Sequence, residues 1–130
     1  MYYRYADEYN KINEMTGFGM FAKSERRVSN CYGENKYVYD GKNGVNIEKL
    51  KDRFIEAWDE CSDCAPDYMQ GLTGEEFFDC FNPDDIVEDA DAWDNDDFRR
   101  FFIEHIYNDE AAIILNDGAI VFDENLIEEA

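Results

Sequence analysis

Two cysteines have the spacing found in many metal-binding and redox proteins. Cys61 and Cys64 form a Cys-x-x-Cys pair, which can supply half of a tetrahedral zinc site. The second half of a zinc signature is missing, because Cys31 and Cys80 are isolated in the chain. Cys61 also falls on the apolar side of a predicted helix, where a reduced cysteine packs as a small hydrophobic residue. The pattern therefore favours packing cysteines, and a small zinc-binding protein is an alternative.

The chain has a single histidine, His105, which on a helical projection lies beside Phe98, Phe101 and Phe102. This position is typical of a histidine at the boundary of a core. No nucleophile motif surrounds any cysteine, and the sequence has no P-loop, dinucleotide fingerprint or HExxH motif. We therefore expect no enzymatic activity, no cofactor and no bound metal.

The densest set of reactive side chains is a run of carboxylates. The segment Asp84–Asp97 carries eight acidic residues and no Lys or Arg. As one continuous helix it would be ~21 Å long and would present one charge per ~2.6 Å of axis. A DNA duplex presents one charge per ~1.7 Å, and each strand one per ~3.4 Å. The segment therefore matches a nucleic acid in linear charge density.

A helical projection separates most of these carboxylates from the apolar residues of the same segment. The acids on one side, which we expect to bind a partner, are Asp84, Asp85, Glu88, Asp89, Asp91 and Asp96. Asp94 and Asp97 fall on the apolar side, so we expect the helix to break near Asp94 and restart. We expect Trp93 and Tyr107 to be exposed aromatic residues that give the contact its specificity. Charge alone speeds the association of any basic partner but does not distinguish one basic partner from another.

The negative charge of the whole chain is polarised. Residues 66–130 contain 20 Asp and Glu against two basic residues, whereas residues 1–65 contain 12 acidic and 10 basic residues. The net charge of −20 therefore lies almost entirely in the second half. A folded domain repels itself at such a charge, and solubility needs far less. We therefore expect a basic partner, and the commonest large basic surface in a cell is a nucleic-acid-binding cleft.

The first elements that must position these residues are strands and one long helix. Residues 1–45 are rich in strand and turn residues, with candidate strands at Phe18–Ala22 and Lys36–Asp40. Asn46 can cap a helix from Ile47 to about Cys61, because apolar residues recur there on one face.

Three more helices complete a mainly helical stretch over residues 46–108. Thr73–Glu76 fits a capping box before a short helix. Asp84–Trp93 is the next candidate helix. Asp94 or Asn95 can cap a last helix over residues 98–107.

A β-hairpin is predicted near the end of the chain, in residues 111–123. The β-prone runs Ala112–Leu115 and Ala119–Phe122 flank Asn116-Asp117-Gly118, and Asp-Gly is a strong turn signal. Asp123 can then cap a helical turn. Together the elements predict one acidic α+β domain over residues 1–130, with several short helices and an antiparallel sheet.

In size, aromatic content and charge the chain resembles the nucleic-acid-mimicking inhibitors of phages and mobile elements, the anti-CRISPR and anti-restriction proteins. The acids of Asp84–Asp97 carry this resemblance, with the flanking pairs Glu75-Glu76 and Asp109-Glu110. It implies a stoichiometric inhibitor whose carboxylates replace phosphates in the basic groove of a host defence nuclease. A CRISPR-Cas effector is the first expected target and a restriction enzyme the second. The alternative binding function is an acidic adaptor or chaperone for a basic protein.

The sequence also limits where the protein acts. The chain opens without an apolar signal-peptide core, and its longest aliphatic stretches are too short to span a bilayer. We expect a protein of the host cytoplasm that binds neither membranes nor nucleic acid directly. The sequence leaves its oligomeric state open.

Overall fold

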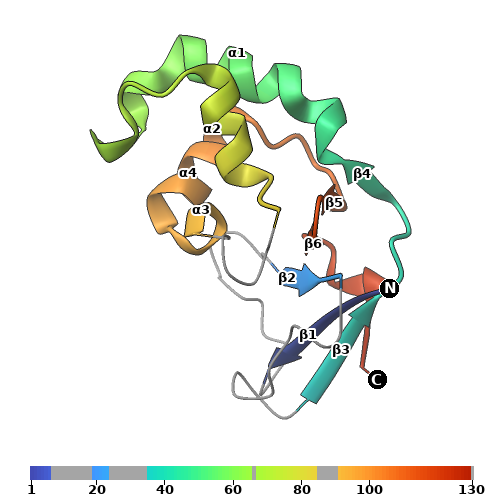
Figure 1. Cartoon of the computed structure of the whole chain (residues 1–130). Helices are drawn as coiled ribbons and strands as arrows, with labels where there is room; N and C mark the ends of the chain where they lie inside the picture. Colours follow the sequence, from blue (N-terminus) through green and yellow to red (C-terminus); the bar gives the residue numbers. More distant parts are fainter. Residues whose placement is uncertain (7–18, 24–34, 66, 85–90, 130) are drawn as a thin grey trace.

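The strands form one sheet, and the main helices pack on one side of it (Figure 1). The computed structural model describes residues 1–6, 19–23, 35–65, 67–84 and 91–129. The strands within these ranges are β1 Tyr2–Ala6, β2 Gly19–Ala22, β3 Asn35–Tyr39, β4 Gly44–Asn46, β5 Ala112–Leu115, β6 Gly118–Val121 and β7 Ile127–Glu129. Their order in space is β4-β5-β6-β2-β1-β3-β7, and only the β4–β5 pair is parallel. The predicted α+β class is therefore confirmed.

The predicted strands and the predicted hairpin are present. The candidates at residues 18–22 and 36–40 correspond to β2 and β3. Strands β5 and β6 pair with Leu115 opposite Gly118, so the two residues between them form the turn. Strands β1, β4 and β7 were not predicted. β4 and β7 have three residues each, which is too short for a recognisable alternation of apolar and polar residues.

The sheet is curled, and the curl brings β3 close to β4. These strands are joined by a short turn although they are far apart in the pairing order. The Tyr39 hydroxyl donates to the Lys42 carbonyl at 2.8 Å. A Cβ on Gly44 would lie 2.7 Å from the Tyr39 oxygen and 2.7 Å from Cδ1 of Ile114. A side chain at this position would have to displace Ile114 or Tyr39, so glycine allows the two strands to approach.

Alternating side chains give the sheet two apolar faces. Ile113, Leu115 and Ile120 point toward the helices and join the main core. A second cluster lies on the other face, within the curl, and consists of Phe21, Tyr37, Tyr39, Ala112, Ala119 and Val121. The curl therefore buries both faces of β5 and β6.

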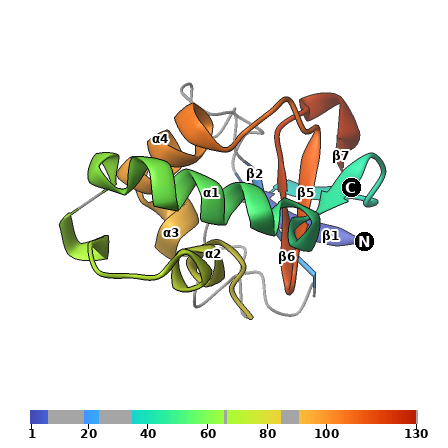
Figure 2. The ribbon, with the colours of Figure 1, turned by 90° about the horizontal axis from the view of Figure 1, so that it is seen from above.

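The helices gather on one side of the molecule, as the view from above shows (Figure 2). They are the 3₁₀ helix η3 Ile47–Leu50, α1 Lys51–Cys61, η4 Ser62–Cys64, η5 Asp67–Met69, α2 Gly74–Phe81, α3 Asp91–Asp94 and α4 Asp96–His105. A further 3₁₀ helix, η6 Glu124–Leu126, comes between β6 and β7 in the chain and lies on the sheet side of the molecule (Figure 2). None of these helices is long and apolar enough to cross a membrane, within the described ranges. Both chain ends lie at the sheet, away from α1–α4 (Figure 1).

The predicted helix caps are confirmed by their hydrogen bonds. Asn46 accepts from the Glu48 amide at 2.9 Å, so the first predicted helix begins as η3 and continues as α1. Thr73 forms the predicted capping box at the start of α2. Asn95, rather than Asp94, caps α4 and so starts it two residues earlier than predicted. Asp123 accepts from the Asn125 amide at 3.0 Å and caps η6.

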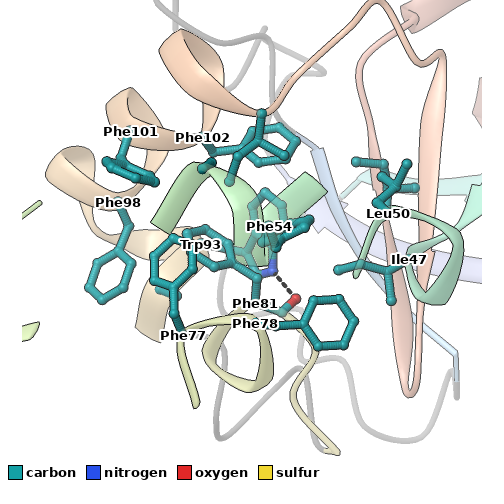
Figure 3. Packing of buried hydrophobic residues seen from close by; sticks show 14 of the residues in the cluster. Ile47, Leu50, Phe54, Phe77, Phe78, Phe81, Trp93, Phe98, Phe101 and Phe102 are labelled. Carbon is teal, nitrogen blue, oxygen red and sulfur yellow. Dashed lines mark hydrogen bonds between the residues drawn. The ribbon is translucent and has the colours of Figure 1, made fainter. Parts of the chain in front are cut away.

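Aromatic rings fill the core between the helices (Figure 3). Phe54 of α1 is at the centre, with ring centroids 5.3 Å from both Phe78 and Phe81 and 5.8 Å from Phe102. Trp93 of α3 packs edge-on against Phe81 at 4.9 Å and donates its indole N–H to the Phe81 carbonyl at 2.7 Å. The short helices are therefore held together by their aromatic faces rather than by their length.

The acidic segment Asp84–Asp97 is not one continuous helix. Asp84 lies in a bend, and residues 85–90 lie outside the described residues. Asn95 is extended, with φ −95° and ψ 125°, and separates α3 from α4. The predicted break near Asp94 is therefore confirmed, and the charge density calculated for a single fourteen-residue helix does not apply to the whole segment.

Tyr39 provides a prediction for alkaline pH. Burial, followed by the charges of Asp40 and Tyr2, raises the pKa of Tyr39 to about 12. Since an unfolded tyrosine titrates near pH ~10, Tyr39 contributes stability that is complete below that pH and is lost as the pH rises toward 12. The free energy of unfolding, measured in urea from pH 9 to 12, should therefore fall less steeply for Tyr39→Phe than for wild type. Equal slopes would contradict this role for Tyr39.

Candidate partner-binding surface

Of the six acids predicted to bind a partner, the structure describes the side chains of Asp84 and Asp96 and the backbone of Asp91. Asp84 is exposed, and its carboxylate accepts from Nδ2 of Asn116 at 3.2 Å. Asp91 is the first residue of α3. Asp96 is exposed in the first turn of α4, 3.7 Å from Nη1 of Arg99. The other three predicted acids, Asp85, Glu88 and Asp89, lie outside the described residues.

Trp93 is not a surface residue, and the prediction that it contacts a partner through an exposed ring is wrong. Its side chain is 0% exposed. The ring packs against Phe81 and Phe102, with centroids 4.9 and 5.1 Å away. Its indole N–H is satisfied inside the core, so the fold, not a partner, explains this tryptophan. Tyr107 is half-buried, and its hydroxyl donates to the Glu110 carbonyl at 3.0 Å.

The acidic surface extends further than the predicted segment. Between Arg53 and Arg99 the sequence has 16 Asp and Glu and no Lys or Arg. Eleven of them are exposed in the described ranges: Glu56, Asp59, Glu60, Asp63, Asp67, Glu75, Glu76, Asp79, Asp84, Asp96 and Asp97. We call these the acidic helical surface. The long gap between basic residues could have identified it in the sequence.

The amphipathic helices explain why these carboxylates point outward. α1 buries Phe54, Ala57 and Trp58, and α2 buries Phe77, Phe78 and Phe81, so the acids of both helices remain on their outer faces. The two helices also approach closely. A Cβ on Gly74 would lie 2.9 Å from Cγ2 of Ile55, so glycine allows the N-terminus of α2 to pack on α1. Exposed acids of α1 and α2 are thereby brought onto neighbouring helices.

The negative field acts on two cysteines of these helices. Burial, together with Asp79 and Glu76, raises the pKa of Cys80. Partial burial raises the pKa of Cys61, with further contributions from Cys64, Glu60 and Asp63. Both effects disfavour the thiolate, which is the nucleophilic and metal-binding form.

The positions of Cys61 and Cys80 agree with a packing role, whereas that of Cys64 does not. Cys61 and Cys80 are partly buried against the main core, and Cys64 is exposed. Cys31 lies outside the described residues. Within the described ranges, no group of three or more His, Cys, Asp or Glu could hold a metal ion.

His105 packs on Phe101 with ring centroids 4.8 Å apart, at the edge of the core as predicted.

Glu110 does not belong to the acidic helical surface, although the sequence suggested it as a flanking acid. It is only 8% exposed, and its carboxylate lies 2.6 Å from Nη1 of Arg53. The other carboxylate oxygen accepts from the Asn108 amide at 2.9 Å. Arg53 also donates to the Ile106 carbonyl at 3.0 Å, so the pair joins α1 to the end of α4. Asp109 beside it is exposed.

Breaking this pair should destabilise the protein. Glu110→Gln should lower the free energy of unfolding by about 1–3 kcal/mol, because a buried bond to a charged group is lost while Arg53 can still reach solvent. Urea denaturation would measure the loss. In a double-mutant cycle, Arg53→Met should cost less once Glu110 is changed, and the remaining cost is the lost bond to the Ile106 carbonyl. Full additivity of the two losses would contradict the coupling.

No protein-family model, curated protein or solved structure matches the chain. The surface must therefore be interpreted from its own geometry.

Proposed function

We propose that the protein is a stoichiometric inhibitor that occupies the nucleic-acid-binding site of a basic protein. The target class is a host defence nuclease, with a CRISPR-Cas effector first and a restriction enzyme second. The exposed carboxylates of the acidic helical surface take the places of phosphates against Lys and Arg of the target. No catalytic step is part of this proposal.

One observation supports the proposal most strongly. Eleven exposed carboxylates come from α1, α2, the start of α4 and the segments between them, and no Lys or Arg interrupts the sequence from residue 54 to residue 98. A predominantly negative surface attracts a basic partner and speeds its association. The surface also repels nucleic acid, so a target that has bound this protein at its nucleic-acid site cannot bind DNA or RNA there.

Competition on a purified nuclease tests the proposal. A tag at either terminus leaves the helices free, because both ends lie at the sheet (Figure 1). We expect one equivalent of the protein to prevent the nuclease from binding labelled DNA or RNA. Raising the salt concentration should weaken the complex, since exposed charges are screened over ~10 Å at 0.1 M.

The same assay separates mimicry from the adaptor alternative. A nuclease that binds this protein and labelled nucleic acid at the same time would contradict competition and would favour an acidic adaptor. Inhibition that persists after the protein is removed would also contradict stoichiometric binding.

A further inference from the structure

Packing in the core does not explain the position of Cys64, which is exposed at the end of the 3₁₀ helix η4. Its neighbour Cys61 is the last residue of α1 and is only partly buried against the main core. Both residues are therefore accessible to dissolved oxidants. Cys80 differs from them, because its thiol donates to the Glu76 carbonyl at 3.3 Å within α2.

The backbone between Cys61 and Cys64 forms a single tight turn. Ser62 has right-handed helical angles, with φ −57° and ψ −27°, and begins the 3₁₀ helix that ends at Cys64. In such a turn the Cα atoms of the first and fourth residues are about 5–6 Å apart, and their side chains lie on the same side. A disulfide needs a Cα separation of ~4.4–6.8 Å. The turn therefore has the span that a disulfide between its two ends requires.

Hydrogen bonds that do not involve the cysteines hold this turn against the rest of the fold. The Ser62 carbonyl accepts from the Ala65 amide at 3.0 Å and from Nε2 of Gln70 at 2.7 Å. The same nitrogen of Gln70 also donates to the Ala65 carbonyl at 3.3 Å. These bonds can persist when the two thiols are joined, so oxidation does not require the segment after α1 to refold.

The charges around the two thiols are negative. Burial raises the pKa of Cys61, and Cys64, Glu60 and Asp63 raise it further, so the two thiols are close enough to interact. A raised pKa disfavours the thiolate, which slows oxidation but also makes the reduced pair less stable relative to the disulfide. The neighbouring acids also repel an anionic reagent and attract a cationic one.

We propose that Cys61 and Cys64 form a reversible disulfide at the end of α1, with hydrogen peroxide as the oxidant, and that the surrounding acids shield the pair from anionic oxidants. The Cys64 thiolate attacks the peroxide, so that an S–O bond forms, the O–O bond breaks and hydroxide leaves. The Cys61 thiol then attacks the sulfenic sulfur and loses its proton. The S–S bond forms, the S–O bond breaks and water leaves.

This reaction is balanced without a further reagent. The two thiols give two electrons to the peroxide, and the proton from the first thiol converts the hydroxide to a second water. The disulfide closes a ring that contains Ser62 and Asp63. Because Asp63 is part of the acidic helical surface, the pair makes this part of the surface responsive to peroxide. The chemistry of the pair does not depend on the proposed function.

Oxidation of the reduced protein with hydrogen peroxide, followed by peptide mapping in a mass spectrometer, tests the proposal. We expect an intramolecular Cys61–Cys64 disulfide that dithiothreitol reverses, both in wild type and in Cys31→Ser with Cys80→Ser. Cys64→Ser should not form this disulfide. Because Cys64 is exposed, that variant should fold as wild type does, and circular dichroism would check this.

Two disulfide reagents of opposite charge test the role of the acids. At low salt the cation cystamine should oxidise the pair at least about tenfold faster than the anion glutathione disulfide, after each rate is divided by that for a small neutral dithiol. Added salt should reduce this ratio. Glu60→Gln with Asp63→Asn should also reduce it. The matched control, Glu128→Gln with Glu129→Gln on β7, should leave it unchanged.

A disulfide that joins other cysteines, or a dimer linked through Cys64, would overturn the proposed pairing. So would two free thiols after exposure to a peroxide concentration that oxidises the urea-unfolded protein. Equal normalised rates for cystamine and glutathione disulfide would overturn the shielding by the acids. None of these results bears on competition with nucleic acid, so the disulfide and the proposed function can fail separately.

Discussion

Reversing Asp84 and Asp97 together to lysine should weaken binding of the proposed target by at least about 30-fold, which is the effect of losing one contact of ~2 kcal/mol. Each charge contact that is buried on binding and then lost can cost ~2–5 kcal/mol. Both residues are exposed on the acidic helical surface, so the change should leave the core intact. Affinity at fixed salt would be measured by titration calorimetry, and folding by circular dichroism.

The matched control reverses Glu128 and Glu129 of β7, which changes the net charge by the same amount. These acids are exposed on the last strand of the sheet, away from α1–α4 (Figure 1). We expect an affinity change of less than about threefold, because distant charges affect mainly the association rate. If both variants bind equally well, or both lose affinity equally, the acidic helical surface is not the binding site.

A second pair, Asp59→Lys with Glu60→Lys, tests how far the contact extends. These residues are near the C-terminus of α1, where cations are favoured by the helix dipole, so the substitution should not destabilise the helix. Glu48 should not be reversed in such tests, because it takes part in a hydrogen-bonded chain that links η3 to the β5–β6 turn. Its carboxylate accepts from Nδ2 of Asn82 at 3.2 Å, and Asn82 in turn accepts from the Asn116 amide.

Local signals predicted the helices and the hairpin because those signals are short-range. Asn46, Thr73 and Asn95 each cap a helix through amides two or three residues away, and the sequence displays both partners. The hairpin likewise needs only two adjacent β-prone runs and a turn.

Long-range pairing was not predictable in the same way. β4 pairs in parallel with β5, although 65 residues separate Asn46 from Ala112, and β7 pairs with β3 from the opposite end of the chain. Each contributes three residues, which is too few for a periodic signal. Their places depend on the curl around Tyr39 and Gly44, which only the tertiary structure reveals.

The residues of the candidate site could also be predicted only in part, because long-range contacts decide which acids are exposed. Composition indicated an acidic surface, but it could not separate free carboxylates from those bound within the fold. Glu110 looks like its neighbour Asp109 in the sequence, yet Arg53, 57 residues earlier, holds it in the interior. Trp93 was misassigned for a related reason, since its partners Phe81 and Phe102 come from α2 and α4.

Replacing Trp93 by phenylalanine should destabilise the protein by about 2–4 kcal/mol. The change removes the indole N–H that donates to the Phe81 carbonyl and leaves a cavity beside Phe81 and Phe102. Since a domain of this size is stable by only ~5–15 kcal/mol, urea denaturation should show a clear shift of the midpoint without a change in slope. Trp93→Ala should be worse and should not give a folded protein at useful yield.

The Trp93 substitution and the reversal of Asp84 and Asp97 should affect different properties, stability in the first case and binding in the second. The folded fraction of Trp93→Phe should bind the target as wild type does, because the ring is 0% exposed and cannot touch a partner. Asp84→Lys with Asp97→Lys should show the opposite pattern, with weak binding and a smaller loss of stability, which comes from the Asn116–Asp84 hydrogen bond and from a cation at the N-terminus of α4. A Trp93→Phe variant that is as stable as wild type but binds weakly would place this ring in the interface and contradict its assignment to the core.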